Sequence, residues 1–188
     1  MNRAEQKKLR RQEILLKALD LFVQKGYVGT KTKEIAKALE MSEGLLFHYF
    51  PTKEALYLEL VKLGVEGVQV FGKQIEDPYK VFYDIIEHFF QKAKESRSVA
   101  KMFILIDRAQ NKERTPEEVY KVATTVDTIR DSVPIIETGQ KKGVFRSGDP
   151  LSLSFTLWNA VQGNMEALAR NPEMDVPDAA WIMSILAK

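Results

Sequence analysis

The sequence predicts an all-α protein of about nine helices, and three observations support this fold class. Apolar residues recur at spacings of three and four along the 188 residues, as one face of a helix requires. No segment alternates apolar and polar residues as a strand does, and no Asn-Gly or Asp-Gly pair signals a hairpin. Ten glycines and seven prolines fall mostly between the apolar stretches, where helices are expected to end.

The composition excludes several classes of protein and site. The chain has no cysteine and only two histidines, so no disulfide scaffold, metal site or other cofactor is expected. The longest apolar runs hold five residues (102–106 and 179–183), far fewer than the ~20 that span a bilayer. The basic N-terminus lacks the apolar segment of a secretory signal, which indicates a cytoplasmic protein without a membrane partner.

Charge is unevenly distributed along the chain. Residues 1–53 hold 11 Lys and Arg against 6 Asp and Glu, whereas the other 135 residues hold 17 against 20. A basic N-terminal part on a mildly acidic body favours contact with a polyanion such as nucleic acid. A solvated helix face would carry the same charges, so the motifs within this part have to decide between the two interpretations.

The first three expected helices form a cluster of short elements. The first covers residues 4–25, and Gly26 ends it because glycine adopts the left-handed conformation at little cost. The second covers residues 32–39. The third is capped by Ser42 and ends near Phe50.

A long fourth helix links this cluster to the rest of the chain. Thr52 caps it, and it is expected to continue toward Ile75. Its buried line follows spacings of four and three and consists of Leu56, Leu60, Gly64, Val68, Phe71 and Ile75.

The fifth and sixth helices begin at recognisable capping residues. Asp77 precedes Pro78, and this pair places a cap directly before a proline at the first helical position. Ser96 or Ser98 opens the sixth helix, which carries the longest apolar run of the chain.

Three more helices are expected after that. Residues 115–118 read as a capping box that starts the seventh, and Pro134 should kink or break it. Asp149 and Pro150 start the eighth in the same way as the fifth. A short ninth helix follows Pro177.

Residues 32–49 fit the pattern of a helix-turn-helix, in which two short helices touch across a tight turn. Counting Thr32 as the first position, the touching positions need apolar or small residues, and all six have them. These residues are Ile35, Ala36, Leu39, Met41, Leu46 and Tyr49.

A longer stretch around this hairpin makes the pattern more specific. Residues 26–57 resemble the DNA-binding domain of the tetracycline-repressor-like (TetR/AcrR) family of bacterial regulators. Their sequence is GYVGTKTKEIAKALEMSEGLLFHYFPTKEALY. The resemblance covers residues 8–65 closely and the rest of the chain only in architecture. It implies a DNA-binding domain over residues 1–52 and a ligand-binding and dimerisation domain over residues 53–188.

In this family the third helix enters the major groove of double-stranded DNA, and the protein is a homodimer. Free amides at helix N-termini attract phosphate, while contacts to base edges select the sequence. The resemblance therefore implies a set of DNA-contacting residues: Lys31, Thr32, Lys33, Ser42, Glu43, Gly44, Leu45, His48, Tyr49, Thr52 and Lys53.

This sequence departs from the family pattern at three positions in or beside the helix-turn-helix. Lys31 stands where the family usually has Thr or Ser, and Leu45 replaces a common threonine. Glu40 stands where the family usually has glycine, so a left-handed turn there would cost about 1 kcal/mol. These departures affect the expected base contacts and not the insertion of the helix into the groove.

The resemblance also implies two sites in the C-terminal part. A small-molecule effector, expected to be largely hydrophobic, would contact Phe82, Ile86, His88, Phe89, Met102, Phe103, Ile106 and Trp158. The eighth and ninth helices would form the dimer interface through Phe155, Val161, Met165, Leu168, Trp181 and Ile185. A plain apolar core within one subunit is the alternative for both sets.

The sequence thus predicts a homodimeric, ligand-responsive repressor that binds a palindromic operator. An activator or a regulator without a ligand are alternatives within the same class. An all-helical enzyme is disfavoured, because the chain lacks a phosphate loop, a metal-binding spacing and a constellation of nucleophile, base and acid. A helical protein-interaction module without DNA binding is the more remote alternative.

Overall fold

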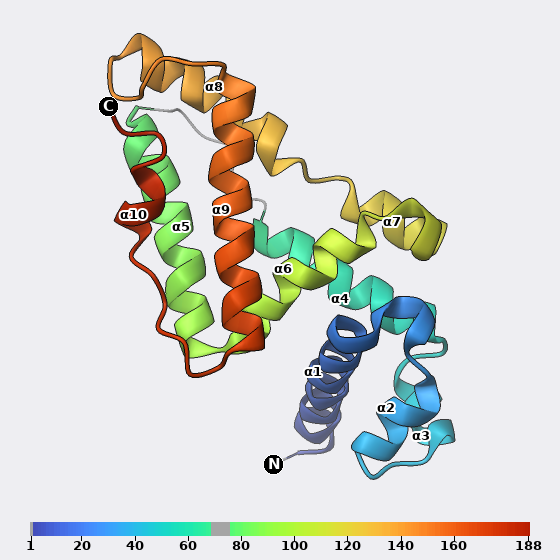
Figure 1. Cartoon of the computed structure of the whole chain (residues 1–188). Coiled ribbons are helices and arrows are strands. Elements are labelled where there is room, and N and C mark those ends of the chain that lie inside the picture. The colour runs from blue at the N-terminus through green and yellow to red at the C-terminus, as the bar shows by residue number, and fades with distance from the viewer. Residues whose placement is uncertain (1, 69–75) are drawn as a thin grey trace. The chain divides into compact units, whose positions relative to one another are not determined.

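The computed structural model describes residues 2–68 and 76–188, and the regular elements of this part are all helices joined by turns, apart from an isolated bridge between Phe145 and Ala187 (Figure 1). Ten α-helices and one 3-10 turn are present in the described residues: α1 Arg3–Gly29, α2 Thr32–Ala38, α3 Glu43–Tyr49, α4 Lys53–Val68, α5 Pro78–Glu95, α6 Arg97–Ala109, η1 Lys112–Arg114, α7 Glu117–Ala123, α8 Thr128–Lys141, α9 Pro150–Arg170 and α10 Ala179–Met183. The expectation of an all-α fold is confirmed.

The chain divides into two compact units, with boundaries within α4, within α6 and between α7 and α8. Unit 1 consists of Met1–Glu66 with Ile104–Thr125, and unit 2 consists of Gly67–Phe103 with Val126–Lys188. Unit 1 therefore joins α1 to α4 with the C-terminal part of α6 and with α7.

The core of unit 1 contains a cluster of three aromatic rings. Phe22 of α1 is 1% exposed, and its ring centroid lies 4.8 Å from that of Tyr57 in α4 and 6.2 Å from that of Tyr27. Arg108 of α6 donates a hydrogen bond to the Phe22 carbonyl at 3.0 Å. Burial of these large rings stabilises the contact of α1 with α4.

Unit 2 is a bundle in which α5, α8, α9 and α10 surround one apolar core. Phe82 is fully buried between the rings of Phe145 and Trp158, at centroid distances of 6.1 and 6.5 Å. The indole nitrogen of Trp158 donates to the buried hydroxyl of Ser132 at 2.7 Å. The one polar atom of that ring is therefore satisfied inside the core.

The segment expected to form the seventh helix forms two helices, α7 and α8. The prediction that the break lies at Pro134 was wrong. Helix α7 ends at Ala123 and α8 begins at Thr128, where Asp127 accepts a capping bond from the Arg130 amide. Pro134, which was expected to kink or break the helix, lies within α8. The expected capping box is also absent, because the Thr115 hydroxyl donates to the Arg108 carbonyl instead.

The long linking helix is described only in its first part. Thr52 caps α4 by accepting a hydrogen bond from the Ala55 amide at 3.0 Å, as expected. Leu56 and Leu60 are 1% exposed, in agreement with the expected buried line. Phe71 and Ile75 of that line lie outside the described residues.

Candidate nucleic-acid interface

Helices α2 and α3 form the expected helix-turn-helix. Ile35, Ala36 and Leu46 are at most 2% exposed where the two helices meet. Leu39, Met41 and Tyr49 are half-buried beside them. The six touching positions are therefore shielded from solvent, and the spacing of apolar residues is sufficient to place the two helices against each other.

The turn between α2 and α3 depends on an unusual backbone conformation. Glu40 has a φ of 52°, and it is the non-glycine residue with positive φ in the described part of the chain. The next residue, Met41, donates its amide to the Ala36 carbonyl at 3.0 Å and so closes the turn. The sequence left open whether Glu40 adopts a left-handed conformation or the turn differs from the family pattern, and the structure has the left-handed conformation.

Replacing Glu40 with glycine should increase stability. Glycine adopts positive φ without the clash of a Cβ atom, and this gain exceeds its extra entropy in the unfolded chain, so Glu40→Gly should raise the free energy of unfolding by about 0.5–1 kcal/mol. Urea unfolding followed by circular dichroism would measure the change. A loss of stability would show that the Glu40 side chain makes a contribution larger than the backbone strain.

One face of α3 is open to solvent and presents the residues expected to contact bases. Gly44, Leu45 and His48 are exposed, and Tyr49 is half-buried. Ser42 caps the helix by accepting a hydrogen bond from the Leu45 amide at 3.1 Å. The cap and the buried Leu46 fix the rotation of α3, so the opposite side points outward.

Phe47 also belongs to this open face, although the sequence analysis did not include it. Its side chain is 41% exposed, close to the 44% of Leu45. A signal existed in the sequence, because a residue directly after the buried Leu46 is turned away from the core by about 100° of helix. An exposed ring there can stack or make apolar contacts with a base.

Thr32 and Glu43 were both expected to contact DNA, and the structure ties them to each other. The Thr32 hydroxyl donates to the Glu43 carboxylate, which joins the first turn of α2 to the first turn of α3. Lys31 and Lys33, on either side of Thr32, are exposed. Two exposed lysines at the start of α2 can face phosphate groups beside the α3 surface.

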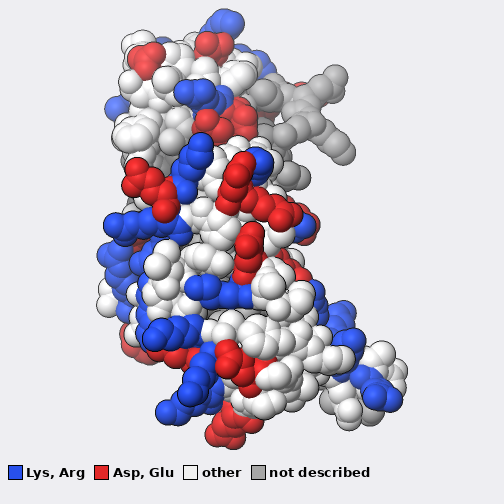
Figure 2. All heavy atoms as spheres, turned by 90° about the vertical axis from the view of Figure 1, so that its right-hand side faces the viewer, with Lys and Arg blue, Asp and Glu red and all other residues white. Residues whose placement is uncertain are grey.

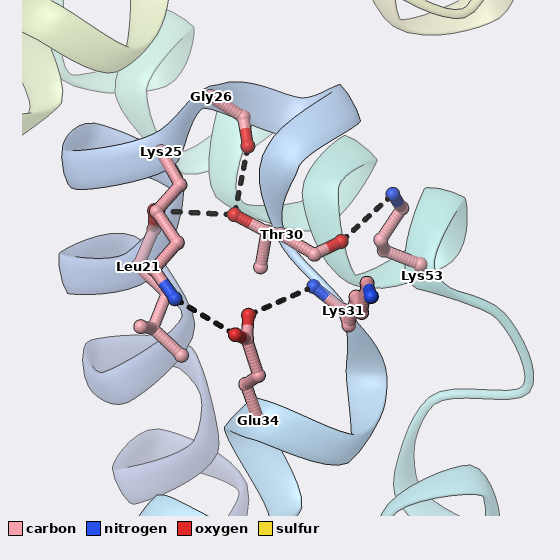
Figure 3. A network of polar contacts seen from close by, with 7 residues as sticks. All are labelled: Leu21, Lys25, Gly26, Thr30, Lys31, Glu34 and Lys53. Carbon is pink, nitrogen blue, oxygen red and sulfur yellow. Dashed lines mark hydrogen bonds and ion pairs between the residues drawn. The ribbon is translucent and has the colours of Figure 1, made fainter.

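Lys53 is held by main-chain oxygens at the end of α1 (Figure 3). Its ammonium donates to the carbonyls of Tyr27 at 2.8 Å and Thr30 at 2.9 Å, and it lies 4.1 Å from the centroid of the Tyr27 ring. Burial lowers the pKa of Lys53 from its ordinary value. Lys53 was expected to contact phosphate directly, and here it fastens the start of α4 to the end of α1.

The end of α1 is shaped by Gly26 and Thr30. Gly26 has a φ of 72°, which breaks the helix as expected, although helical residues resume over 27–29. The buried Thr30 hydroxyl donates to the carbonyls of Gly26 at 2.7 Å and Leu21 at 3.1 Å (Figure 3). These bonds tie Thr30 back to the preceding turns of α1.

Glu34 connects α2 to this end of α1. Its carboxylate accepts hydrogen bonds from the Lys25 ammonium at 2.8 Å and from the Lys31 amide at 3.3 Å (Figure 3). The bond from Lys25 is the main cause of the lowered pKa of Glu34, with the Lys31 amide second. Helix α2 therefore starts at a position fixed by side-chain bonds.

Two arginines of α1 reach toward the other end of the helix-turn-helix. Arg10 donates to the Leu39 carbonyl at 2.9 Å, at the end of α2. Arg11 pairs with Glu59 of α4, and its guanidinium lies 4.3 Å from the centroid of the Phe50 ring. Part of the basic charge of the N-terminus thus serves to position α2, α3 and α4. On the face shown in Figure 2, Lys and Arg side chains are mixed with Asp and Glu.

The residues expected to line an effector pocket are divided between the two units. Phe82, Ile86, Phe89 and Trp158 are at most 6% exposed in the core of unit 2, and Met102 and Phe103 are half-buried in the same unit. His88, expected to orient a ligand, is exposed. Ile106 belongs to unit 1.

The residues expected at the dimer interface lie on α9 and at the C-terminal end of the chain, and they differ in burial. Val161, Met165 and Leu168 are fully buried in the core of unit 2, which agrees with the alternative of a plain apolar core for these three residues. Their spacing of four and three marks the face of α9 that packs inside the chain. Phe155 is 57% exposed and Trp181 of α10 is 72% exposed, whereas Ile185 is half-buried.

The structure also bears on metal binding and on membrane insertion. In the described residues, no group of three or more His, Asp or Glu side chains could hold a metal ion. Within residues 2–68 and 76–188, none of the helices is both long and apolar enough to span a bilayer.

Comparisons with known proteins connect this geometry to a class of regulators. Residues 14–60 match the family described as "Bacterial regulatory proteins, tetR family". YuxN of Bacillus subtilis, an HTH-type transcriptional regulator, is 50% identical over 48 residues, which cover 26% of this chain and 16% of YuxN. The transcriptional regulator RutR of Escherichia coli K12 is 26% identical over 156 residues, covering 81% of this chain and 72% of RutR.

A solved structure resembles the chain over nearly its whole length. AibR, crystallised in complex with isovaleryl coenzyme A and operator DNA, superposes with a TM-score of 0.70 at 20% identity. The superposition covers 95% of this chain and 98% of AibR, so the two proteins share a fold. These relatives are transcriptional regulators and not enzymes.

Proposed function

We propose that the chain is a transcriptional regulator of the TetR family with a helix-turn-helix DNA-binding domain, and that it acts as a homodimeric, ligand-responsive repressor of a palindromic operator. The observation that carries the proposal is the outward face of α3, where Gly44, Leu45 and His48 are exposed. The opposite side of α3 is buried against α2. Such a helix inserts into the major groove without loss of its packing.

The proposed DNA contacts separate into two groups. Leu45 and His48, together with Phe47, face base edges, and Leu45 can touch the methyl group of thymine. Lys31 and Lys33 face phosphate groups, as do the α2 amides at Thr32. In the proposal, Lys53 acts through the end of α1, because its ammonium is bonded to the Tyr27 and Thr30 carbonyls.

The proposed homodimer uses the outer face of α9 together with α10. Phe155 and Trp181 expose large apolar surfaces, and Leu151 of α9 adds a side chain that is 47% exposed. Exposed rings of this size are uncommon on a monomer and typical of interfaces. A two-fold axis there would pair two copies of the same face. The dimer would then carry two α3 helices, one for each half-site of a palindrome.

The proposed effector is a largely hydrophobic small molecule that binds in unit 2. The apolar side chains of Phe82, Phe89, Phe103 and Trp158 in the core of unit 2 support this chemistry. AibR, with the same fold, binds isovaleryl coenzyme A and operator DNA. An effector that binds one conformation of the dimer more tightly shifts the population away from the DNA-binding conformation.

Substitutions on the two groups of residues should have different effects on DNA binding. Lys33→Ala removes one phosphate contact per chain, so it should weaken binding to all sequences alike and reduce the salt dependence by about one ion per chain. Leu45→Ala should change the preferred bases. Fluorescence anisotropy over a range of salt concentrations measures both effects.

Lys62→Ala is the matched control for Lys33→Ala, because Lys62 is an exposed lysine of α4 away from the α3 face. The affinity of Lys62→Ala for DNA and the salt dependence of that affinity should equal those of the unmodified protein. Equal losses in Lys33→Ala and Lys62→Ala would mean that only the overall charge matters, which would contradict the proposed interface.

A further inference from the structure

A cleft of about 880 Å³ lies in unit 1, apart from the apolar core of unit 2. Its walls come from residues 24–28 at the kink of α1, from Tyr57 of α4, and from residues between 107 and 114 in α6 and η1. All of these residues belong to unit 1. Cavities of roughly 300–1,000 Å³ accommodate drug-sized ligands, so the cleft is large enough for an organic molecule.

Positive charge predominates in the cleft. Its lining holds Lys25, Arg108 and Arg114 against the single carboxylate of Asp107. The Lys25 ammonium forms an ion pair with the Glu34 carboxylate at 2.8 Å, which neutralises part of its charge. The two arginines therefore supply most of the attraction for an anion, and guanidinium groups bind carboxylate and phosphate with two parallel hydrogen bonds.

One of these arginines is held in place by the main chain. Nη1 of Arg108 donates to the Phe22 carbonyl at 3.0 Å, which orients the guanidinium. The neighbouring amide side chains are also fixed, since Gln110 donates to the Ala123 carbonyl at 3.0 Å and Asn111 accepts from the Glu113 amide at 3.1 Å. Little side-chain entropy remains to be lost when a ligand binds.

Apolar groups complete the cleft. Tyr27 is half-buried, and its ring lies 5.1 Å from that of Tyr57, centroid to centroid. Val28 is 74% exposed. A ligand with an apolar or ring-shaped body would cover these side chains while its anionic group faces the arginines.

We infer that this cleft binds a small organic anion, in which a carboxylate or phosphate is attached to a ring-sized apolar body. This site is distinct from the hydrophobic effector site proposed in unit 2. Its walls include Gly26 and Tyr27, whose carbonyls bind Thr30 and Lys53. A ligand there therefore contacts the segment that positions the start of α2.

The inference is tested with benzoate, phenyl phosphate and the neutral benzamide, by calorimetric titration of the full-length protein without DNA. Both anions should bind once per chain, and benzamide should bind at least about tenfold more weakly, as loss of a charge-assisted pair predicts. In backbone amide NMR spectra, the signals of residues 24–28 and 107–114 should shift when the anion binds. Because DNA is absent, the outcome does not depend on operator binding.

Two variants and a control make the result specific. Arg114→Gln should weaken anion binding about tenfold, and Val28→Glu should weaken it by placing a negative charge at the cleft. Lys112→Gln, an exposed lysine of η1 outside the lining, should leave binding unchanged. The inference would be overturned if the anions showed no saturable binding or if benzamide bound as tightly as they do. It would also be overturned if Lys112→Gln lost as much anion affinity as Arg114→Gln, or if the NMR shifts were confined to unit 2.

Discussion

Phe22→Ala should lower the free energy of unfolding by about 3–5 kcal/mol and abolish DNA binding near 37 °C. The Phe22 side chain is 1% exposed, and its ring contacts those of Tyr27 and Tyr57. Its removal leaves a cavity between α1 and α4, and the loss approaches the 5–15 kcal/mol that stabilises a typical domain. Urea unfolding and anisotropy with operator DNA measure the two effects.

The control for this substitution is Leu16→Ala on the same helix. Leu16 is 53% exposed, so its truncation leaves no cavity and should change stability by less than about 0.5 kcal/mol. DNA binding of Leu16→Ala should be unchanged. If Phe22→Ala were as stable as Leu16→Ala, the aromatic cluster could not be what fastens α1 to α4.

Gly139→Ala should destabilise unit 2 by about 1–3 kcal/mol despite the better helix propensity of alanine. A Cβ atom at Gly139 would lie 2.1 Å from Cδ2 of the Phe145 ring, which is 2% exposed. The ring cannot move away freely, because it is buried in the core and packs against Phe82 at a centroid distance of 6.1 Å. Thermal unfolding measures the loss.

Two further variants distinguish overpacking from a general effect of alanine. A Cβ atom at Gly67 of α4 meets no atom within 4 Å, so Gly67→Ala should be neutral or stabilising by up to about 1 kcal/mol. Combining Gly139→Ala with Phe145→Leu should lose less stability than the sum of the two changes, since the smaller side chain leaves room. Full additivity would contradict the close contact.

The helix-turn-helix was predictable from the sequence because local rules determine it. Ser42 as a cap, the apolar positions from Ile35 to Tyr49 and the glycine at 26 each act within a few residues. Such features depend on backbone sterics and hydrogen bonds that a sequence displays directly.

The contacts between distant segments could not be read from the sequence. Lys53 lies 23 residues from Thr30 along the chain, and nothing local indicates that its ammonium binds the Thr30 carbonyl. Helix α9 is apolar on more than one side, and periodicity does not decide which side faces the core, so Val161 and Phe155 were placed in one interface. The Arg108 bond to Phe22 depends on packing in the same way.

The most direct test of the account is selection of DNA fragments by the purified protein, after removal of bound small molecules, followed by sequencing. A dimer that presents two α3 helices about 34–36 Å apart should enrich a palindrome whose half-sites are centred about ten base pairs apart. Footprinting of the selected site should protect both halves. Enrichment of single half-sites without symmetry, or of no sequence at all, would contradict a dimeric repressor that reads DNA through α3.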